Sequence, residues 1–144
     1  MLIGTHKHIL DSKKRVSLPA RFRKEMGNEV VITHGLDSCL FVYTISEWEK
    51  VAEKLSGMSM GTTDSRSINR FMLGGATLTE IDSIGRILVP EFLKEFAGLQ
   101  EKVVIIGVHS RLEIWDEEKW KTYSRETEMQ ADKLAQKLGE LGVM

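Results

Sequence analysis

Hydrophobic and polar positions follow the same order of patterns twice along the 144-residue chain. Each half opens on an extended stretch, passes through a polar turn into a short β-favouring run, and reaches a proline. A short helix, two strands joined by a glycine-containing turn and an amphipathic helix follow. The expected extended stretches are His6–Leu10 and Thr77–Ile81, the β-favouring runs Arg15–Leu18 and Arg86–Val89, the short helices Pro19–Met26 and Pro90–Ala97, and the strand pairs Val30–Thr33 with Leu40–Tyr43 and Val103–Ile106 with Leu112–Trp115.

Proline, glycine and capping residues set the expected helix ends. Pro19 and Pro90 are placed in the first helical turn, where a missing amide hydrogen costs nothing, and a glycine stops each of these helices. Later helices begin at residues whose side chains can accept from free amides. The expected caps are Ser46 with Glu49 after the first strand pair, Asp64 for a helix over Arg66–Leu73, and Asp116 for the last helix.

The repetition extends to residue identity. Gly4–Trp48 aligns with Gly75–Trp120 at an offset of 71 residues, which becomes 72 after Gly27. A unit of about 45 residues is too small to bury a sufficient core alone, so we expect one intertwined α+β body with a pseudo-two-fold axis. We divide the chain into a first unit at residues 1–55, a linker and helix at 56–74, and a second unit with a C-terminal helix at 75–144. Identical pairs include Gly4/Gly75, Asp11/Asp82, Arg15/Arg86, Pro19/Pro90 and Trp48/Trp120.

Composition is that of a globular protein, with 42% hydrophobic and 28% charged residues. No apolar run, Val103–Ile106 included, approaches the about 20 residues that cross a membrane, and no basic-then-apolar leader opens the chain. A single cysteine, Cys39, excludes an intramolecular disulfide and fits a reducing compartment. We therefore expect a soluble cytoplasmic protein without membrane association.

Charge is distributed unevenly behind a net value of −1. Residues 1–26 carry seven basic and two acidic side chains, a sum of +5, and the other 118 residues carry 13 basic and 19 acidic ones, a sum of −6. Local potential decides whether a polyanion is attracted. The basic N-terminal segment is thus compatible with nucleic-acid binding, although charge asymmetry alone does not establish it.

Two pentads of the form Asp-x-x-x-Arg stand at equivalent positions of the repeat. Arginine can bind guanine O6 and N7 or clamp a phosphate, and the neighbouring lysines suit phosphate. Aspartate is repelled by DNA, so we expect it to brace the turn through backbone amides or its own arginine. From spacing alone, the aspartate and the arginine of each pentad can also merely brace the turn. The pentads are Asp11-Ser12-Lys13-Lys14-Arg15 and Asp82-Ser83-Ile84-Gly85-Arg86.

With Met1–Gly4 and Arg70–Ala76, these pentads and the prolines after them closely resemble the MraZ family of bacterial transcriptional regulators, over essentially the whole chain. The resemblance implies an α+β fold of two pseudo-two-fold-related swapped-hairpin β-barrel halves of the AbrB/SpoVT type, with flanking helices. It also implies sequence-specific binding of double-stranded DNA at the promoter of the division and cell-wall gene cluster, including the protein's own gene. Family members bind short direct repeats as ring-shaped homo-oligomers, which places this protein at the nucleoid.

Carried over by position, the resemblance assigns DNA contact to Lys13, Lys14, Arg15 and Arg86. One departure concerns Lys14, because the family usually has glycine there, as at Gly85. Lysine tolerates positive φ poorly, so either the first turn differs in shape or the lysine adds a phosphate contact. The full set of expected DNA-binding residues is Lys13, Lys14, Arg15, Arg86, Lys7, Ser12 and Ser83, with Asp11 and Asp82 bracing the turns.

Other basic residues leave alternatives open. Lys7 lines the same face as its histidine neighbours, or the three alternate along a solvated strand. The basic residues of the first short helix serve DNA, a neighbouring subunit or only solubility; these are Arg21, Arg23 and Lys24. Arg66 and Arg70 lie one helical turn apart and are expected to pair, within the chain or between subunits, with acidic groups such as Glu80 or Glu113.

Catalytic and metal sites have little support. Cys39 could be joined by His34 or His109, but zinc sites usually show paired ligands, and a small buried residue is the ordinary interpretation of such a cysteine. Gly74-Gly75 lacks the spacing and the lysine of a phosphate-binding loop. We expect no enzyme activity, cofactor, metal or small-molecule substrate. The alternative function is an oligomeric scaffold that binds proteins through its tail, where Leu134, Ala135, Leu138 and Leu141 recur at helical spacing.

Overall fold

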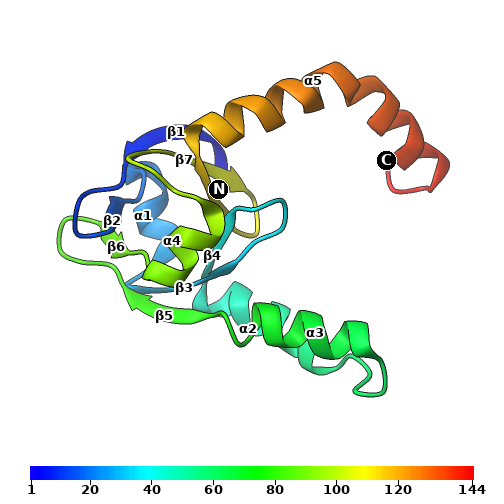
Figure 1. Cartoon of the computed structure of the whole chain (residues 1–144), viewed down its shortest axis with the longest axis horizontal. Coiled ribbons are helices and arrows are strands. Elements are labelled where there is room, and N and C mark those ends of the chain that lie inside the picture. Colours follow the sequence, from blue (N-terminus) through cyan, green and yellow to red (C-terminus); the bar gives the residue numbers. More distant parts are fainter.

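A six-stranded antiparallel sheet runs through the middle of the protein in a computed structural model that describes residues 1–144 (Figure 1). A separate two-stranded ribbon, β2 with β6, lies against it. The strands are β1 Ile3–Ile9, β2 Arg15–Ser17, β3 Glu29–His34, β4 Leu40–Thr44, β5 Thr77–Glu80, β6 Arg86–Leu88, β7 Lys102–Val108 and β8 Leu112–Asp116. The helices are α1 Ala20–Met26, α2 Ile45–Ser56, α3 Thr63–Met72, α4 Glu91–Ala97 and α5 Glu117–Glu140.

Strand order shows that the two halves are interleaved. The sheet runs β1-β7-β8-β4-β3-β5, so β1 of the first half pairs with β7 of the second, and β5 of the second pairs with β3 of the first. Phe41 faces Glu113 between β4 and β8, and Val16 faces Ile87 in the ribbon. Both pairs join residues that the repeat aligns with each other, so the pseudo-two-fold axis passes through them. The expected intertwined α+β fold is confirmed.

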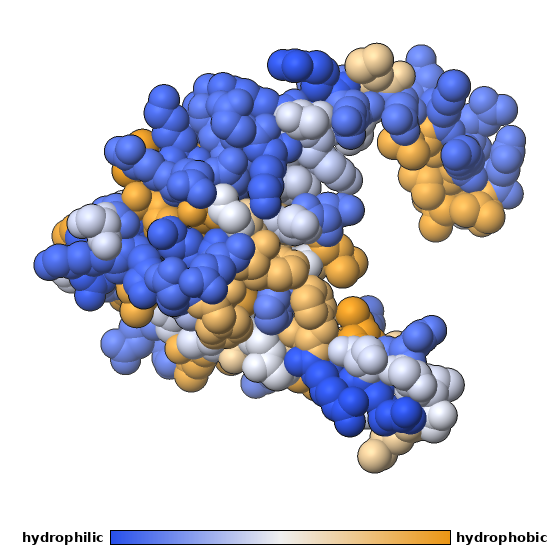
Figure 2. Space-filling view, viewed as in Figure 1, coloured by the Kyte–Doolittle hydropathy of each residue, from blue (hydrophilic) through white to orange (hydrophobic).

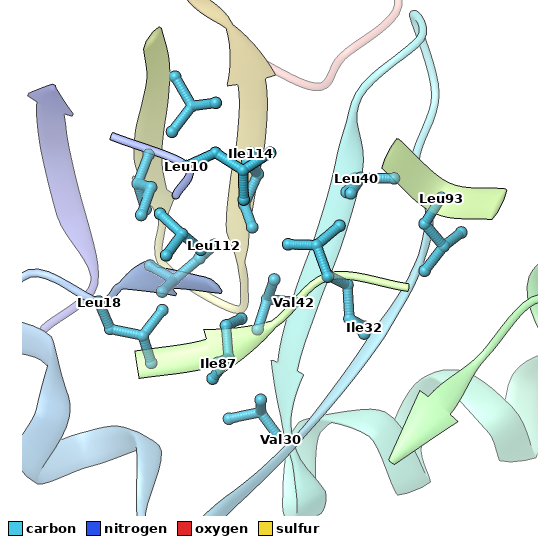
Figure 3. Packing of buried hydrophobic residues seen from close by; sticks show 14 of the residues in the cluster. Leu10, Leu18, Val30, Ile32, Leu40, Val42, Ile87, Leu93, Leu112 and Ile114 are labelled. Atoms are coloured by element: carbon cyan, nitrogen blue, oxygen red, sulfur yellow. The ribbon is translucent and has the colours of Figure 1, made fainter. Parts of the chain in front are cut away.

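Two hydrophobic cores lie on opposite faces of the sheet. The larger one contains 19 buried residues, including side chains from both halves and from the inner face of the ribbon. Figure 3 shows Ile87 of β6 beside Val42 of β4 in this core. The smaller core contains Phe41, Tyr43, Val104 and Trp115, covered by side chains of α2, α3 and α5. The ribbon is therefore held by the larger core, together with α1 and α4, which contribute Phe22, Met26, Leu93 and Ala97.

The sequence predicts Pro19 and Pro90 inside the first helical turn, but both lie just before their helices. Pro19 has ψ of 133° and Pro90 has ψ of 146°, so each continues the extended backbone of the ribbon. Their carbonyls accept the first helical hydrogen bonds, from Phe22 at 2.9 Å and from Leu93 at 3.1 Å. The missing amide hydrogen is still harmless, because the residue at this position has no intrahelical partner for it.

Two of the three expected helix caps lie two residues after the observed caps. Thr44 caps α2 by accepting from the amide of Glu47 at 3.2 Å, in place of Ser46 with Glu49. Thr62 caps α3, and Asp64 instead lies in its first turn. In both cases a threonine that is still extended precedes the predicted cap and provides the hydroxyl first. Asp116 caps α5 as expected.

The last helix, α5, leaves the body and carries the C-terminus away from it (Figure 1). Trp115, Trp120 and Tyr123 pack together at its base, with ring centroids 4.8 to 6.1 Å apart. Beyond that base every side chain except that of Ser124 is exposed. Figure 2 shows an apolar surface on the inner side of the distal end of α5, with hydrophilic residues on its outer side.

Candidate nucleic-acid interface

The β2–β6 ribbon presents both pentad arginines on one outer face. Val16 and Ile87 point into the larger core, so the alternation of strand side chains turns their neighbours outward. Arg15 lies opposite Leu88, and Ser17 lies opposite Arg86. The two arginines therefore occupy diagonal corners of a four-residue outer surface, and neither is buried.

The turns that lead into the ribbon have the same hydrogen-bonded shape. In the first, the amide of Asp11 donates to the carbonyl of Arg15 at 2.9 Å, and the amide of Lys14 donates to the carbonyl of Asp11 at 3.0 Å. In the second, the amide of Asp82 donates to the carbonyl of Arg86, and the amide of Gly85 donates to the carbonyl of Asp82, each at 2.9 Å. The repeat in the sequence is thus a repeat of backbone geometry.

Each pentad aspartate accepts hydrogen bonds from the amides of its own turn. Asp11 Oδ1 accepts from the amides of Lys13 at 2.8 Å and Arg15 at 2.9 Å. Asp82 Oδ1 accepts from Ile84 at 3.1 Å and Arg86 at 2.8 Å. The Arg15 amide is the main cause that lowers the pKa of Asp11, and the Arg86 amide does the same for the pKa of Asp82. Both carboxylates are therefore ionised and engaged in holding the turns.

Lys14 adopts the left-handed conformation that its glycine counterpart also adopts. Its φ is 62°, against 84° for Gly85, so the interpretation that the first turn differs in shape is wrong. Lysine stays in this conformation because its backbone is held from both sides, with the carbonyl also accepting from the amide of Val89 at 2.7 Å. Its ammonium lies 3.1 Å from a carboxylate oxygen of Glu91, an exposed pair that lowers the pKa of Glu91.

The equivalent space in the second turn is filled differently. Arg23 lies over Gly85, so a side chain at position 85 would overlap its guanidinium group. Arg23 Nε donates to the carbonyl of Leu18 at 3.0 Å, and the amide of Leu18 donates to the carbonyl of Gly85 at 2.9 Å. Arg23 thus supports the second turn, a structural role that differs from the three alternatives of DNA, a neighbouring subunit or solubility.

The two pentad arginines differ in their pairing. Arg86 Nε donates to Asp82 Oδ2 at 2.8 Å, and Arg86 Nη1 lies 4.0 Å from Asp11 Oδ2. The side chain of Arg15 takes part in no ion pair or hydrogen bond within the chain. The guanidinium group of Arg15 consequently has no partner within the chain, whereas part of Arg86 is already engaged.

The remaining predicted residues are placed at different distances from this face. Lys13, Ser12 and Ser83 are exposed at the tips of the turns. Lys7 is exposed on β1 and pairs in register with Val104, whose side chain lies in the smaller core on the sheet face away from the ribbon. The structure therefore brings six of the seven predicted DNA-binding residues together and separates Lys7 from them.

The histidines of β1 alternate with Lys7 and do not share its face. His6 packs edge-on against Phe22 with ring centroids 5.1 Å apart. Burial is the main cause that lowers the pKa of His8, and the electrostatic effects of His6 and Arg23 add to it. His8 is therefore neutral at pH 7 and adds no charge to the ribbon.

The predicted pairing of Arg66 and Arg70 with Glu80 or Glu113 does not occur within the chain, and pairing between subunits stays a prediction. Arg66 donates to the carbonyl of Met60 at 2.8 Å, and Arg70 forms no ion pair. Glu113 instead accepts from Arg111 and from the indole of Trp115 at 3.0 Å. Both donors are neighbours of Glu113 along the chain, Trp115 within β8 and Arg111 immediately before it.

Cys39 is fully buried, and burial raises the pKa of its thiol. Its Sγ donates to the carbonyl of Leu36 at 3.1 Å. No group of three His, Cys, Asp or Glu side chains is arranged to hold a metal ion, and no helix is long and apolar enough to cross a membrane. The thiol matches the expectation of a small buried residue.

Leu88 is the member of the ribbon face that the sequence analysis did not single out. It stands in the apolar run Ile87–Val89, in which no alternation distinguishes an outer residue from a core residue. The only signal was the repeat itself, which aligns Leu88 with the polar Ser17. A leucine at a position where the first half has a serine indicated a residue that faces outward.

Fold and surface together define a class of protein: a duplicated, strand-interleaved α+β chain that exposes a braced two-stranded ribbon with arginines on its outer face. The model of one family, described as "MraZ protein, putative antitoxin-like", matches residues 1–71 and again residues 72–140. The chain belongs to this MraZ family.

Curated relatives are similar over their whole length. The chain is 46% identical to the "Transcriptional regulator MraZ" of Caldicellulosiruptor saccharolyticus, over 99% of this chain and 100% of that protein. Identity is 44% to the protein of that name in Caldicellulosiruptor bescii and 42% to that in Acetivibrio thermocellus, with the same coverage. These relatives therefore share both halves and the linker between them.

Replacement of Lys14 tests the left-handed turn. Lys14→Gly removes the strain of a side chain at φ of 62°, so its free energy of unfolding should exceed that of Lys14→Ala by about 1 kcal/mol. The exposed pair with Glu91 is lost in both variants and cancels. Urea unfolding followed by circular dichroism measures the difference. The matched control is Lys54→Gly against Lys54→Ala in helix α2, where alanine should be the more stable. Equal stabilities of the two Lys14 variants would contradict a strained turn.

The lowered pKa values of Asp11 and Asp82 predict a pH dependence of stability. A carboxyl whose folded pKa lies below its ordinary value of 3.8 stabilises the fold above that pH, and this stability is lost as pH falls through the folded pKa. The double variant Asp11→Asn/Asp82→Asn should therefore lose less stability than the wild type between about pH 5 and 2.

Urea unfolding at a series of pH values provides the measurement. Asp132→Asn, at an exposed position of α5, is the control, and its free energy of unfolding should depend on pH as that of the wild type does. If the free energies of unfolding of the wild type and the double variant fell in parallel with pH, the two carboxylates would not support the turns.

Proposed function

We propose that this protein is a sequence-specific DNA-binding transcriptional regulator, without catalytic activity, at the promoter of the division and cell-wall gene cluster that includes its own gene. The observation that carries the proposal is the outer face of the ribbon, where the unpaired Arg15 lies beside Lys13 and Lys14 and diagonal to Arg86. The names of the relatives support it, since they are transcriptional regulators. Such a protein acts in the cytoplasm at the nucleoid.

A two-stranded ribbon suits the major groove of B-DNA, which is about 12 Å wide and admits such an element. Arg15 is the base-reading residue, because its free guanidinium can donate two parallel bonds to a guanine. Lys13, Lys14, Ser12 and Ser83 at the turn tips contact phosphates on either side of the groove. Asp11 and Asp82 hold the turns, and their negative charge is offset by turn amides and by Arg86.

Self-assembly into a ring belongs to the same proposal. Strands of three residues cover few base pairs, so one ribbon alone binds weakly. Several copies on direct repeats about 10 base pairs apart would face the same side of the duplex and gain effective concentration. The exposed apolar face of α5 supports the assembly, with Leu134 39% and Leu138 42% exposed.

The domain division at 1–55, 56–74 and 75–144 remains part of this proposal. The first and last segments each supply one turn and one ribbon strand to the DNA-binding face, and the last also supplies α5 for assembly.

Removal of the Arg15 side chain tests DNA binding. Footprinting of the wild type on DNA upstream of its own gene first locates the operator. Arg15→Ala should weaken binding to this operator by about 1–3 kcal/mol and relax base preference there. Arg86→Ala should have a smaller effect, because Arg86 is engaged by Asp82. Gel-shift titration at fixed salt measures both, with Arg125→Ala on α5 as the control. Unchanged affinity of Arg15→Ala would favour the alternative, a protein-binding scaffold.

Disruption of the α5 apolar face tests assembly. Leu134→Asp/Leu138→Asp should convert the assembly to smaller species in light scattering, while single-repeat DNA affinity is kept and the added affinity for multiple repeats is lost. Met129→Asp is the control, since Met129 is 81% exposed on the opposite face of the same helix. A wild-type mass for the double variant would show that assembly uses another surface.

A further inference from the structure

The outer face of the ribbon is not symmetric, although its backbone is. The pseudo-two-fold axis relates Arg15 to Arg86 and Ser17 to Leu88. One end of the face therefore pairs an arginine with a leucine, and the other end pairs an arginine with a serine. Any ligand that covers this face meets a polar corner and an apolar corner in a fixed order.

No contact within the fold explains why an apolar residue, Leu88, stands at this exposed position. Its side chain is 43% exposed, whereas its neighbours Ile87 and Val89 are fully buried and already supply the core contacts of this segment. A lone exposed leucine is ordinary on a protein surface. This one, however, stands directly across the ribbon from the arginine that is free to bind an external group.

We propose that Leu88 contacts the 5-methyl group of a thymine next to the base pair bound by Arg15, an inference that rests on the proposed DNA-binding function. Directly opposed residues of an antiparallel pair have Cβ atoms about 5 Å apart, and base pairs stack at about 3.4 Å, so the two side chains reach the same or the adjacent base pair. The thymine methyl is the apolar group that the major groove offers there.

The contact also discriminates against cytosine. Cytosine presents an amino donor at this edge of the groove, and leucine would leave that donor without an acceptor. Ser17, at the corresponding corner beside Arg86, can instead accept or donate a hydrogen bond. The pseudo-symmetric ribbon thereby reads a sequence with a direction, with thymine at the Leu88 end.

Deoxyuridine substitution tests this contact, because it removes the thymine methyl and leaves every hydrogen-bonding group in place. In a gel-shift titration with the footprinted operator, each thymine of a repeat is replaced in turn. For the wild type, one position per repeat should weaken binding about fourfold, the value for one buried methyl group. Leu88→Ala should bind the unmodified operator about fourfold more weakly and be indifferent to deoxyuridine at that position.

Control variants separate the contact from general effects. Leu36→Ala, another exposed leucine in the turn between β3 and β4, should keep the wild-type affinity and deoxyuridine profile. Leu88→Met should keep most of the sensitivity, since it retains an apolar side chain of similar size. Unfolding curves identify any variant whose fold has changed.

The outcomes are distinguishable from failure of the proposed function. If the wild type shows no sequence-specific binding, the DNA-binding proposal itself is wrong. If the wild type binds specifically but Leu88→Ala has the same affinity and the same deoxyuridine profile, the thymine contact is overturned. That result would also be expected if Leu88 served a protein partner.

Discussion

The pairing of β2 with β6 is the interaction on which the rest of this structure depends. Each strand has three residues and comes from a different half of the chain, so neither forms a ladder without the other. Their central residues, Val16 and Ile87, are fully or almost fully buried in a core that both halves share. The turns are also fixed across the axis, because Val89 donates to the carbonyl of Lys14 and Leu18 to that of Gly85. A separated half would lose the ribbon, the hydrogen bond that fixes its turn from the other half, and much of its core together.

Duplication inside one chain then lets the two sides of the ribbon diverge. The backbone stays symmetric because the two prolines, the two aspartates and the core residues repeat. The side chains around the turns do not: Lys14 pairs with Glu91, while its counterpart Gly85 lies under Arg23. Arg86 is bound by Asp82, while Arg15 is free. Folding requires the symmetric backbone and core, whereas the side chains on the outer face of the ribbon can differ between the two halves and are available to a ligand.

Local structure followed from the sequence wherever a short-range rule decided it. The strands, the short helices after the prolines and the cap at Asp116 all depend on neighbours within a few residues, and so do the hydrogen bonds of Asp11 to its turn amides. Helix starts were misplaced where two capping residues stood close together, as at Thr44 and Ser46. Features that depend on which strands pair were out of reach. The side to which Lys7 turns and the outward position of Leu88 follow from the register of β1 with β7 and of β2 with β6.

Under the proposed function, a ribbon with two different sides is compatible with assembly into a ring. A true two-fold dimer reads a palindrome, since each half meets the same bases. A single chain whose two sides differ reads a site with a direction, and identical sites placed head to tail are direct repeats. Head-to-tail contacts between subunits, which close into rings when the rotation permits, keep every copy in the same orientation. An inverted arrangement of sites would instead demand a two-fold contact between neighbouring subunits. Under the proposed function, directional reading by the ribbon would therefore match head-to-tail assembly, because both require that the two sides of the duplicated chain differ.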